Sequence, residues 1–407
     1  MSNIIRYIKL SIPNILKYRI KYLYKLVFLF YSKEKDSQFT SRYQARQMSK
    51  NFNQYKKIRR LSEAINFSSI DITSKQDYSS SNSYLSNSKF KTYKTNTGGT
   101  TGAPLVMYKS RNDLAYEAAF IDYYLKLCGV SIFSPYKSIR IRGERLNGWC
   151  RRNGYNKVSL SSYHINEDSC LSYWEYIEEF KPEVIFCYPS SLYLLCKELD
   201  AIEFLGKVNL KAIVFSSETL HQYQVKVIKK YFDSKLLNLF GNTEHTILAV
   251  NWLEGKGFEI NPYYSYVENI EGRLVSSSFN DKNMPFIRYF SDDTISVSPD
   301  GYVQLEGRIQ DFAIGLSGQK FPLVGLIFGQ HFELFELVKE MRIRQNKVGE
   351  IILEYYSYSP VSSDILKETR QIISDVTNGD IIVDFYHSNT FLPRTNAGKL
   401  KFFTSEI

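Results

Sequence analysis

A ten-residue stretch early in the chain carries the residue types that bind phosphate. Positions 95–104 hold three glycines and four hydroxyl-bearing residues. Glycine lets the backbone approach a ligand closely, and backbone N–H groups and threonine hydroxyls can donate hydrogen bonds to phosphate oxygens. Flexible surface loops have a similar composition, and the Gly-Lys-Ser/Thr of the usual phosphate loop does not follow. By itself, the stretch is consistent with either kind of loop.

Three later stretches combine residues that suit nucleotide chemistry. The second half of the chain contains Gly-Arg-Ile-Gln-Asp at positions 307–311 and a glycine followed by Lys399 at the end of positions 393–399. A lysine ammonium can stabilise charge that develops on a reacting phosphate, although an exposed basic tail beside Lys401 would look similar. The earliest of the three stretches consists of Phe240, Gly241, Asn242, Thr243 and Glu244. Glu244 provides a carboxylate, the kind of ligand that Mg²⁺ prefers. A strand followed by a capped helix, with Thr243 and Glu244 opening the helix, is the structural alternative.

The four stretches occur in the order and approximate spacing of the motifs of adenylate-forming enzymes. The chain resembles that superfamily over nearly its whole length, and most of all its phenylacetate-CoA ligase-like branch, which includes the CapK-type proteins of capsule and O-antigen gene clusters. The resemblance implies an ATP- and Mg²⁺-dependent ligase that converts a carboxylate into an acyl-adenylate and releases pyrophosphate. The acyl group would then pass to a thiol, on CoA or a carrier, or to an amine.

The resemblance also assigns roles to residues. Glu244 would hold Mg²⁺, Thr243 would meet the phosphate, and the Phe240 ring would stack on adenine beside Gly241 and Asn242. Lys399 would be the catalytic lysine. The ATP phosphates would be wrapped by Thr97, Gly98, Gly99, Thr100, Thr101 and Gly102. His245 is expected to form local hydrogen bonds rather than to bind a ligand.

Two further segments border the implied nucleotide site. Ser217 and Glu218 resemble a short motif beside adenine, although Glu218 suits the start of the following helix equally well because the helix dipole favours a carboxylate there. Residues 188–190 resemble a segment near the acyl pocket of CapK-like proteins. Asp293 would accept hydrogen bonds from the ribose hydroxyls, and Arg308 would reach the ribose or phosphate with its several donors.

The sequence departs from the family pattern at two points. Asp292 stands where the family has glycine, which predicts a tighter or distorted loop. Gln310 stands where the family has its hinge aspartate, and Asp311 follows one position later. These departures favour the alternative function, a non-catalytic nucleotide-binding or scaffold protein of a membrane-associated polysaccharide assembly.

The elements that must position these residues have an α/β pattern. Short apolar strands alternate with helices between positions 138 and 240, as in a parallel sheet buried on both faces, and ligands bind at the carboxyl ends of such strands. The glycine-rich stretch is predicted to join the two strands of a hairpin, 90–95 and 105–109, before a helix capped by Asn112 or Asp113. The remaining strands are predicted at 138–142, 184–188, 212–215 and 235–240, and the helices at 167–180, 192–200 and 220–231.

The chain is predicted to have three parts. Residues 1–60 would form a basic helical segment packed on the body, with breaks near Pro13 and around positions 37–41. Residues 61–310 would form the large ATP- and carboxylate-binding domain, with a β-rich subdomain over 258–305. Residues 311–407 would form a small α+β lid with helices at 323–339 and 363–376 and strands at 350–356 and 381–387. The resemblance implies that the lid swings about a hinge near Gln310.

Charge is concentrated at the N-terminal end of the chain. Residues 1–60 carry fifteen Lys/Arg and two acidic residues, a net charge of +13, and the rest of the 407-residue chain sums to −3. Such a segment either contacts anionic lipid or is a solvated helical face that packs on the body through its apolar side. The apolar run at 26–31 is too short to span a membrane, and nucleic acid is not expected as a partner.

The cysteines and histidines predict neither disulfides nor a zinc site. The five cysteines contain no Cys-x-x-Cys pair, and the five histidines contain no His-x-x-x-His pair. Free thiols are usual in a large cytoplasmic chain. The protein is predicted to be cytoplasmic, with peripheral contact to the inner membrane as the alternative role of its basic segment.

Overall fold

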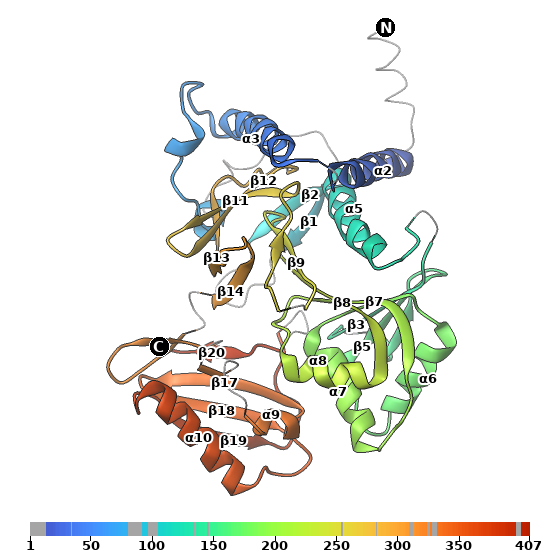
Figure 1. Cartoon of the computed structure of the whole chain (residues 1–407), viewed down its shortest axis with the longest axis vertical. Coiled ribbons are helices and arrows are strands. Elements are labelled where there is room, and N and C mark those ends of the chain that lie inside the picture. The colour runs from blue at the N-terminus through green and yellow to red at the C-terminus, as the bar shows by residue number, and fades with distance from the viewer. Residues whose placement is uncertain are drawn as a thin grey trace. The chain divides into compact units, whose positions relative to one another are not determined.

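The computed structural model divides the chain into two compact units (Figure 1). The first contains Met1–Ile132, Gly241–Ala249 and Ile260–Ser291, and the second contains Phe133–Phe240, Val250–Glu259 and Asp292–Ile407. The predicted domain boundaries at 60 and 310 stay predictions. The structure describes residues 14–33, 35–79, 92–96, 105–132, 135–144, 146–253, 255–281, 283–308, 312–323, 326–327, 332–395 and 400–407.

The first unit begins with two long helices, α2 (Asn14–Lys33) and α3 (Ser37–Arg59). Asp36 caps α3, because its carboxylate accepts a hydrogen bond of 2.7 Å from the backbone N–H of Phe39. The predicted interruption at 37–41 is therefore wrong in position, since these residues form the first turn of α3. Two short helices follow α3, namely η1 (Phe67–Ser69) and α4 (Lys75–Ser79).

The predicted hairpin around the glycine-rich stretch is confirmed. Strands β1 (Thr92–Asn96) and β2 (Val106–Ser110) pair antiparallel, with Asn96 opposite Val106. Helix α5 (Arg111–Leu127) follows at once. Its cap is Ser110 rather than Asn112 or Asp113, because Ser110 and Asp113 exchange side-chain and backbone hydrogen bonds in a capping box. The antiparallel strands β11 (Ser265–Ile270) and β12 (Arg273–Ser278) belong to the same unit.

A largely parallel sheet forms the centre of the second unit. Strands β7, β6, β3 and β5 run parallel to their neighbours, and β4 pairs antiparallel with β5 at the edge. Figure 1 shows three helices packed around this sheet: α6 (Cys170–Phe180), α7 (Pro189–Ala201) and α8 (Gln222–Tyr231). In chain order, the strands are β3 (Ser138–Arg142), β4 (Cys150–Arg152), β5 (Lys157–Ser161), β6 (Val184–Cys187), β7 (Val208–Ser216) and β8 (Phe232–Gly241), with the helix η3 (Ser162–His164) after β5.

The predicted strands and helices of this sheet are confirmed, except that β4 and β5 were not predicted. The apolar runs of β6 and of the second half of β7 are buried, as expected for strands covered on both faces. The core around them includes the nearly inaccessible rings of Tyr173 and Trp174. The α/β class predicted from the sequence is therefore confirmed.

The C-terminal part of the second unit is a four-stranded sheet with α10 (Ser363–Thr377) lying across it in Figure 1. Its strand order is β19 (Ile382–Ser388), β18 (Glu350–Tyr356), β17 (Glu340–Lys347) and β20 (Phe403–Ser405). The helix predicted at 323–339 is wrong at its end, because helix α9 is confined to Leu334–Leu337 and Lys339 leads into β17.

Several short strands connect these parts of the chain. Strands β13 (Tyr289–Val297) and β14 (Val303–Arg308) pair antiparallel and lie largely in the region predicted to be rich in strands. A turn at Gly318, with φ of +82°, joins the hairpin strands β15 (Phe312–Ile314) and β16 (Lys320–Pro322). Strands β9 (Leu248–Asn251) and β10 (Glu259–Ile260) precede them.

A buried ion pair ties α7 to the start of β17. The Lys339 ammonium lies 2.8 Å from both carboxylate oxygens of Glu198, whose side chain is inaccessible to solvent. The Tyr358 hydroxyl donates to the same carboxylate, and the ammonium lies 3.0 Å from the centre of the Tyr358 ring. Removing one partner of such a pair leaves an uncompensated buried charge, which destabilises more than loss of a surface pair.

We therefore predict that Lys339→Ala lowers the free energy of unfolding by about 3–5 kcal/mol. The matched control is Lys347→Ala, which breaks the exposed pair with Glu350 and should cost less than about 1 kcal/mol. Urea unfolding of the full chain measures both. Equal losses in the two variants would contradict the assigned role of Glu198 and Lys339.

Candidate active site

The C-terminal motif is anchored at both of its described ends. Arg394 and Leu400 form an isolated antiparallel bridge, which joins the two ends of the segment that carries Lys399. Lys399 itself lies outside the described residues. The backbone N–H of Leu400 donates a 3.0 Å hydrogen bond to Oε1 of Glu218. The motif is thus attached to the segment that follows β7.

Glu218 receives a second backbone donor from the first turn of α7. The N–H of Ser190 lies 3.0 Å from its Oε2, and N–H groups at a helix N-terminus have no partner within the helix. The alternative in which Glu218 opens α8 is wrong, because α8 begins at Gln222. Burial raises the pKa of Glu218, and the hydrogen bonds from Ser190 and the charge of Arg394 act against that rise.

Arg394 extends the same network to β17. Its guanidinium donates to the carboxylate of Glu340 and, at 3.4 Å, to Oγ of Ser190. The other oxygen of Glu340 accepts a 2.7 Å hydrogen bond from the N–H of Leu392. Burial raises the pKa of Glu340, and Arg394 opposes that shift. The structure therefore brings together three of the motif segments in the second unit: 188–190, 216–218 and the ends of 393–400.

Glu244 lies in a turn of the first unit. The turn follows β8 and does not begin a helix, so the structural alternative for Thr243 and Glu244 is wrong. Asn242 stabilises the turn, because its side chain accepts a 2.9 Å hydrogen bond from the N–H of Thr246 and donates one of 2.7 Å to that residue's hydroxyl. Thr243 is exposed and Glu244 is buried. Oε1 of Glu244 accepts a 2.8 Å hydrogen bond from the hydroxyl of Tyr289.

Three residues around Glu244 were missed from the sequence. The Lys109 ammonium donates to the backbone carbonyl of Glu244 at 2.9 Å and to Oδ2 of Asp281 at 2.7 Å. Lys109 and Asp281 are both nearly inaccessible to solvent. The strand alternation was a usable signal for Lys109, since Met107, two positions earlier on the same face, is buried. Asp281 and Tyr289 had no comparable local signal.

The two residues predicted to contact ribose face each other across a strand pair. Asp293 of β13 is opposite Arg308 of β14 in the register, and Asp293 is buried. Asp292 has φ of 66°, in the left-handed region that glycine adopts most easily. The backbone thus keeps a glycine-like conformation where the sequence lacks the glycine.

The remaining predicted site residues are placed in part. The Phe240 ring, partly exposed, packs edge-on against Phe258 with ring centres 6.0 Å apart. Gly241 ends β8, and a Cβ there would lie 3.2 Å from the carbonyl oxygen of Ile247. Ser217 is exposed with φ of 72°. Thr97, Gly98, Gly99, Thr100, Thr101, Gly102 and the hinge positions Gln310 and Asp311 lie outside the described residues.

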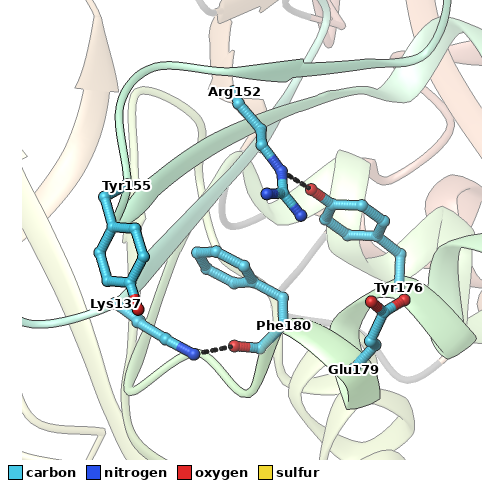
Figure 2. A pocket seen from close by; sticks show the side chains of 6 residues that line it. All are labelled: Lys137, Arg152, Tyr155, Tyr176, Glu179 and Phe180. Atoms are coloured by element: carbon cyan, nitrogen blue, oxygen red, sulfur yellow. Dashed lines mark hydrogen bonds between the residues drawn. The ribbon is translucent and has the colours of Figure 1, made fainter.

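A separate pocket of about 130 Å³ lies at the other edge of the parallel sheet (Figure 2). Lys137 stands at the amino end of β3, and Phe180 ends α6. Figure 2 shows the two hydrogen bonds that join its walls, from Lys137 to the carbonyl of Phe180 and from Arg152 to the hydroxyl of Tyr176. None of the six lining residues is one of the predicted site residues. The motifs cluster instead at the carboxyl ends of β6 and β7.

Comparisons with known proteins agree with the predicted resemblance. No family model matches the chain. The chain is 23% identical over 353 residues to "Protein CapK" of Staphylococcus aureus, covering 79% of this chain and 76% of that protein. The alignment therefore extends over most of both proteins.

Solved structures of CoA ligases share the fold. A 2-hydroxyisobutyryl-CoA ligase in the postadenylation state, in complex with R3-HIB-AMP, aligns with a TM-score of 0.62 and 14% identity over 92% of this chain and 90% of that one. The anthranilate-CoA ligase AuaEII in complex with anthranoyl-AMP aligns with a TM-score of 0.53 and 14% identity over 75% and 65%. The chain has the fold of the adenylate-forming ligases, and the fold expected from its motifs is confirmed.

Two partly buried histidines predict how stability depends on pH. Burial lowers the pKa of His221 and of His245 from 6.5 to about 3, and the nearby Lys109 contributes for His245. Between these two values, the unfolded chain binds protons that the folded chain does not. The stabilisation is therefore fully present above pH 6.5 and is lost as the pH falls toward 3.

We predict that His221→Asn and His245→Asn each reduce the loss of stability between about pH 7 and about pH 5. Urea unfolding midpoints at the two pH values measure the difference for each variant and for the unchanged chain. A slope that stays the same in both variants would show that these histidines are protonated in the folded protein.

Proposed function

We propose that this protein is an ATP-dependent ligase that activates a carboxylate as an acyl-adenylate and passes the acyl group to a thiol or an amine. The observation that carries the proposal is the anchoring of the Lys399 motif on Ser190 and Glu218 at the carboxyl ends of β6 and β7. Ligands bind at this edge of open α/β sheets. The shared fold with CoA ligases that were solved with acyl-adenylates supports the same function.

The environment of Glu244 fits the Mg²⁺ that this reaction uses. Mg²⁺ is typically held by one or two carboxylates together with substrate phosphates. The Glu244 carboxylate accepts a hydrogen bond from the neutral hydroxyl of Tyr289, whereas the Lys109 ammonium contacts only the backbone carbonyl of Glu244 and the Asp281 carboxylate. The carboxylate thus keeps acceptor capacity for a hard cation. Bound Mg²⁺ would offset the negative charge of the phosphates.

The remaining roles follow the predicted assignments. We propose that residues 97–102 and Thr243 bind the phosphates and that Asp293 and Arg308 bind the ribose. Phe240, Gly241 and Asn242 would border the adenine. Both carboxylate oxygens of Glu218 already accept backbone hydrogen bonds, so the exposed backbone at Ser217 is the better candidate for adenine contact.

Lys399 would act on the chemical step. A carboxylate oxygen forms a bond to the α-phosphorus, the bond from that phosphorus to the bridging oxygen breaks, and pyrophosphate leaves with the electron pair. An ammonium beside the α-phosphate stabilises the charge that develops there. In the second step, the thiol or amine attacks the acyl carbon and AMP leaves. If the acceptor is a thiol, CoA would be one molecule that supplies it.

The likeness to CapK favours a role in the biosynthesis of capsular or O-antigen polysaccharide. Acylation of an amino sugar, or loading of a carrier, would be the corresponding reaction, and a cytoplasmic location would supply its ATP. The second candidate function is a non-catalytic nucleotide-binding or scaffold protein. It is favoured by Asp292, which holds a glycine-like backbone conformation without the glycine. Carboxylate-dependent release of pyrophosphate, screened over a panel of carboxylates, distinguishes the two functions.

We predict that Lys399→Ala lowers carboxylate-dependent pyrophosphate release by about 10²–10³-fold, the usual effect of losing one charge contact at a transition state. Nucleotide binding should change little, because the other nucleotide-binding residues remain. Lys401→Ala is the matched control. Acyl transfer from supplied acyl-adenylate should suffer much less, since that step does not use the α-phosphate contact. An unchanged rate in Lys399→Ala would remove Lys399 from the site.

A second prediction concerns Glu244. Glu244→Gln keeps the shape of the side chain and removes its charge, so we expect a higher magnesium concentration for half-maximal activity. Tyr289→Phe is the control, because it removes the hydrogen bond but keeps the carboxylate. The measurement is a magnesium titration of pyrophosphate release, with thermal unfolding to verify folding. An identical titration for Glu244→Gln and the unchanged chain would exclude Glu244 as the metal ligand.

A further inference from the structure

Helix α2 exposes a continuous apolar stripe. Five large apolar side chains on it are between 44% and 68% exposed: Ile20, Leu23, Tyr24, Val27 and Tyr31. They lie three, four, seven and eleven positions after the first of them, a pattern that places them on one face of the helix. Single exposed apolar residues are common on protein surfaces, whereas a contiguous patch indicates a contact surface.

The opposite face fixes the rotation of α2 within its unit. Leu26 and Leu29 are buried, and α2 packs beside α5 (Figure 1). The buried Lys25 ammonium donates a 2.6 Å hydrogen bond to the hydroxyl of Tyr43. It also lies between 4.6 and 5.0 Å from the centres of four rings, those of Phe28, Tyr43, Tyr116 and Phe120. Turning the helix to bury the stripe would pull this cation out of its aromatic surroundings.

Charge identifies the kind of surface that fits the stripe. Helix α2 contains five Lys/Arg and no acidic residue, and Arg19 and Lys33 are exposed near the two ends of the stripe. Apolar side chains flanked by cations are typical of helices that lie in the interface of an anionic bilayer, where tyrosine rings are also well accommodated. In the parts of the chain that the structure describes, no helix has the length and apolarity needed to cross a membrane.

We propose that α2 docks this protein on an anionic lipid bilayer. The helix would lie parallel to the membrane plane, with Leu23, Tyr24 and Val27 at the acyl boundary and Arg19 and Lys33 among the headgroups. An anionic bilayer accounts for both the apolar stripe and the cations at its ends, whereas a second copy of this basic segment would place like charges together. The proposal does not depend on the proposed ligase activity.

Vesicle sedimentation of the full chain tests the proposal. We expect binding to vesicles of phosphatidylcholine with phosphatidylglycerol, little binding to phosphatidylcholine alone, and weaker binding at high salt. The triple variant Leu23→Ser, Tyr24→Ser, Val27→Ser should reduce partitioning by about tenfold or more. The matched control is Leu205→Ser with Tyr155→Ser, which removes two apolar side chains that are 96% and 92% exposed elsewhere and should leave partitioning unchanged.

A second variant keeps the test decisive if the triple variant misfolds. Tyr24→Trp retains an aromatic ring at a 68% exposed position, and its fluorescence should shift to shorter wavelength with anionic vesicles. Absence of that shift, equal binding to neutral vesicles, or equal loss in the control variant would overturn the proposal. A dimer in size-exclusion chromatography that the triple variant converts to a monomer, without vesicle binding by the unchanged chain, would show that a second copy covers the stripe instead.

Discussion

The half-buried carboxylate of Glu218 is the contact on which the motif cluster of the second unit depends. A carboxylate removed from water is costly unless donors replace the lost hydration. Here Ser190, at the start of α7, and Leu400, which follows the proposed catalytic residue Lys399, supply backbone N–H groups, while Arg394 supplies a nearby charge. Since the two backbone donors come from two different segments, 188–190 and 393–400, the carboxylate is satisfied only when both segments are in place. The need to satisfy the Glu218 carboxylate therefore also positions the C-terminal motif at 393–399.

The buried carboxylate of Glu198, on α7, works in the same way. Glu198 receives the Lys339 ammonium and the Tyr358 hydroxyl, so both ends of α7 are attached to the C-terminal part of the chain by charge-assisted contacts. Such contacts are directional, and their loss leaves an unpaired charge rather than a small cavity. The Tyr193 hydroxyl adds two hydrogen bonds to that part of the chain, one of 3.2 Å to the carbonyl of Phe335 and one of 3.1 Å to the carbonyl of Val338.

The sequence predicted the elements with strong local signals and missed those without them. The apolar runs of β6 and β7 and the polar residues at their ends located the central strands and the motif edge. The helix predicted at 323–339 extended past Leu337, where helix α9 ends, and strand β17, which begins at Glu340, was not predicted. A short apolar run does not distinguish a helix from a buried strand. The resemblance to a family predicted Glu244 and Lys399 as site residues, but it did not predict which side chains surround Glu244. Lys109 is 135 residues away from it in sequence, and no local pattern marks such a pairing.

Strand β4 has a consequence for self-association. An open sheet edge carries unpaired backbone groups that can recruit a strand from another molecule, and proteins suppress this with short strands and charged side chains. At this edge, β4 is only three residues long and two of those are the exposed arginines Arg151 and Arg152. Both are held beside the sheet, by Glu144 and Tyr176 respectively. The charged and short β4 therefore disfavours growth of the central sheet by strand addition at this edge.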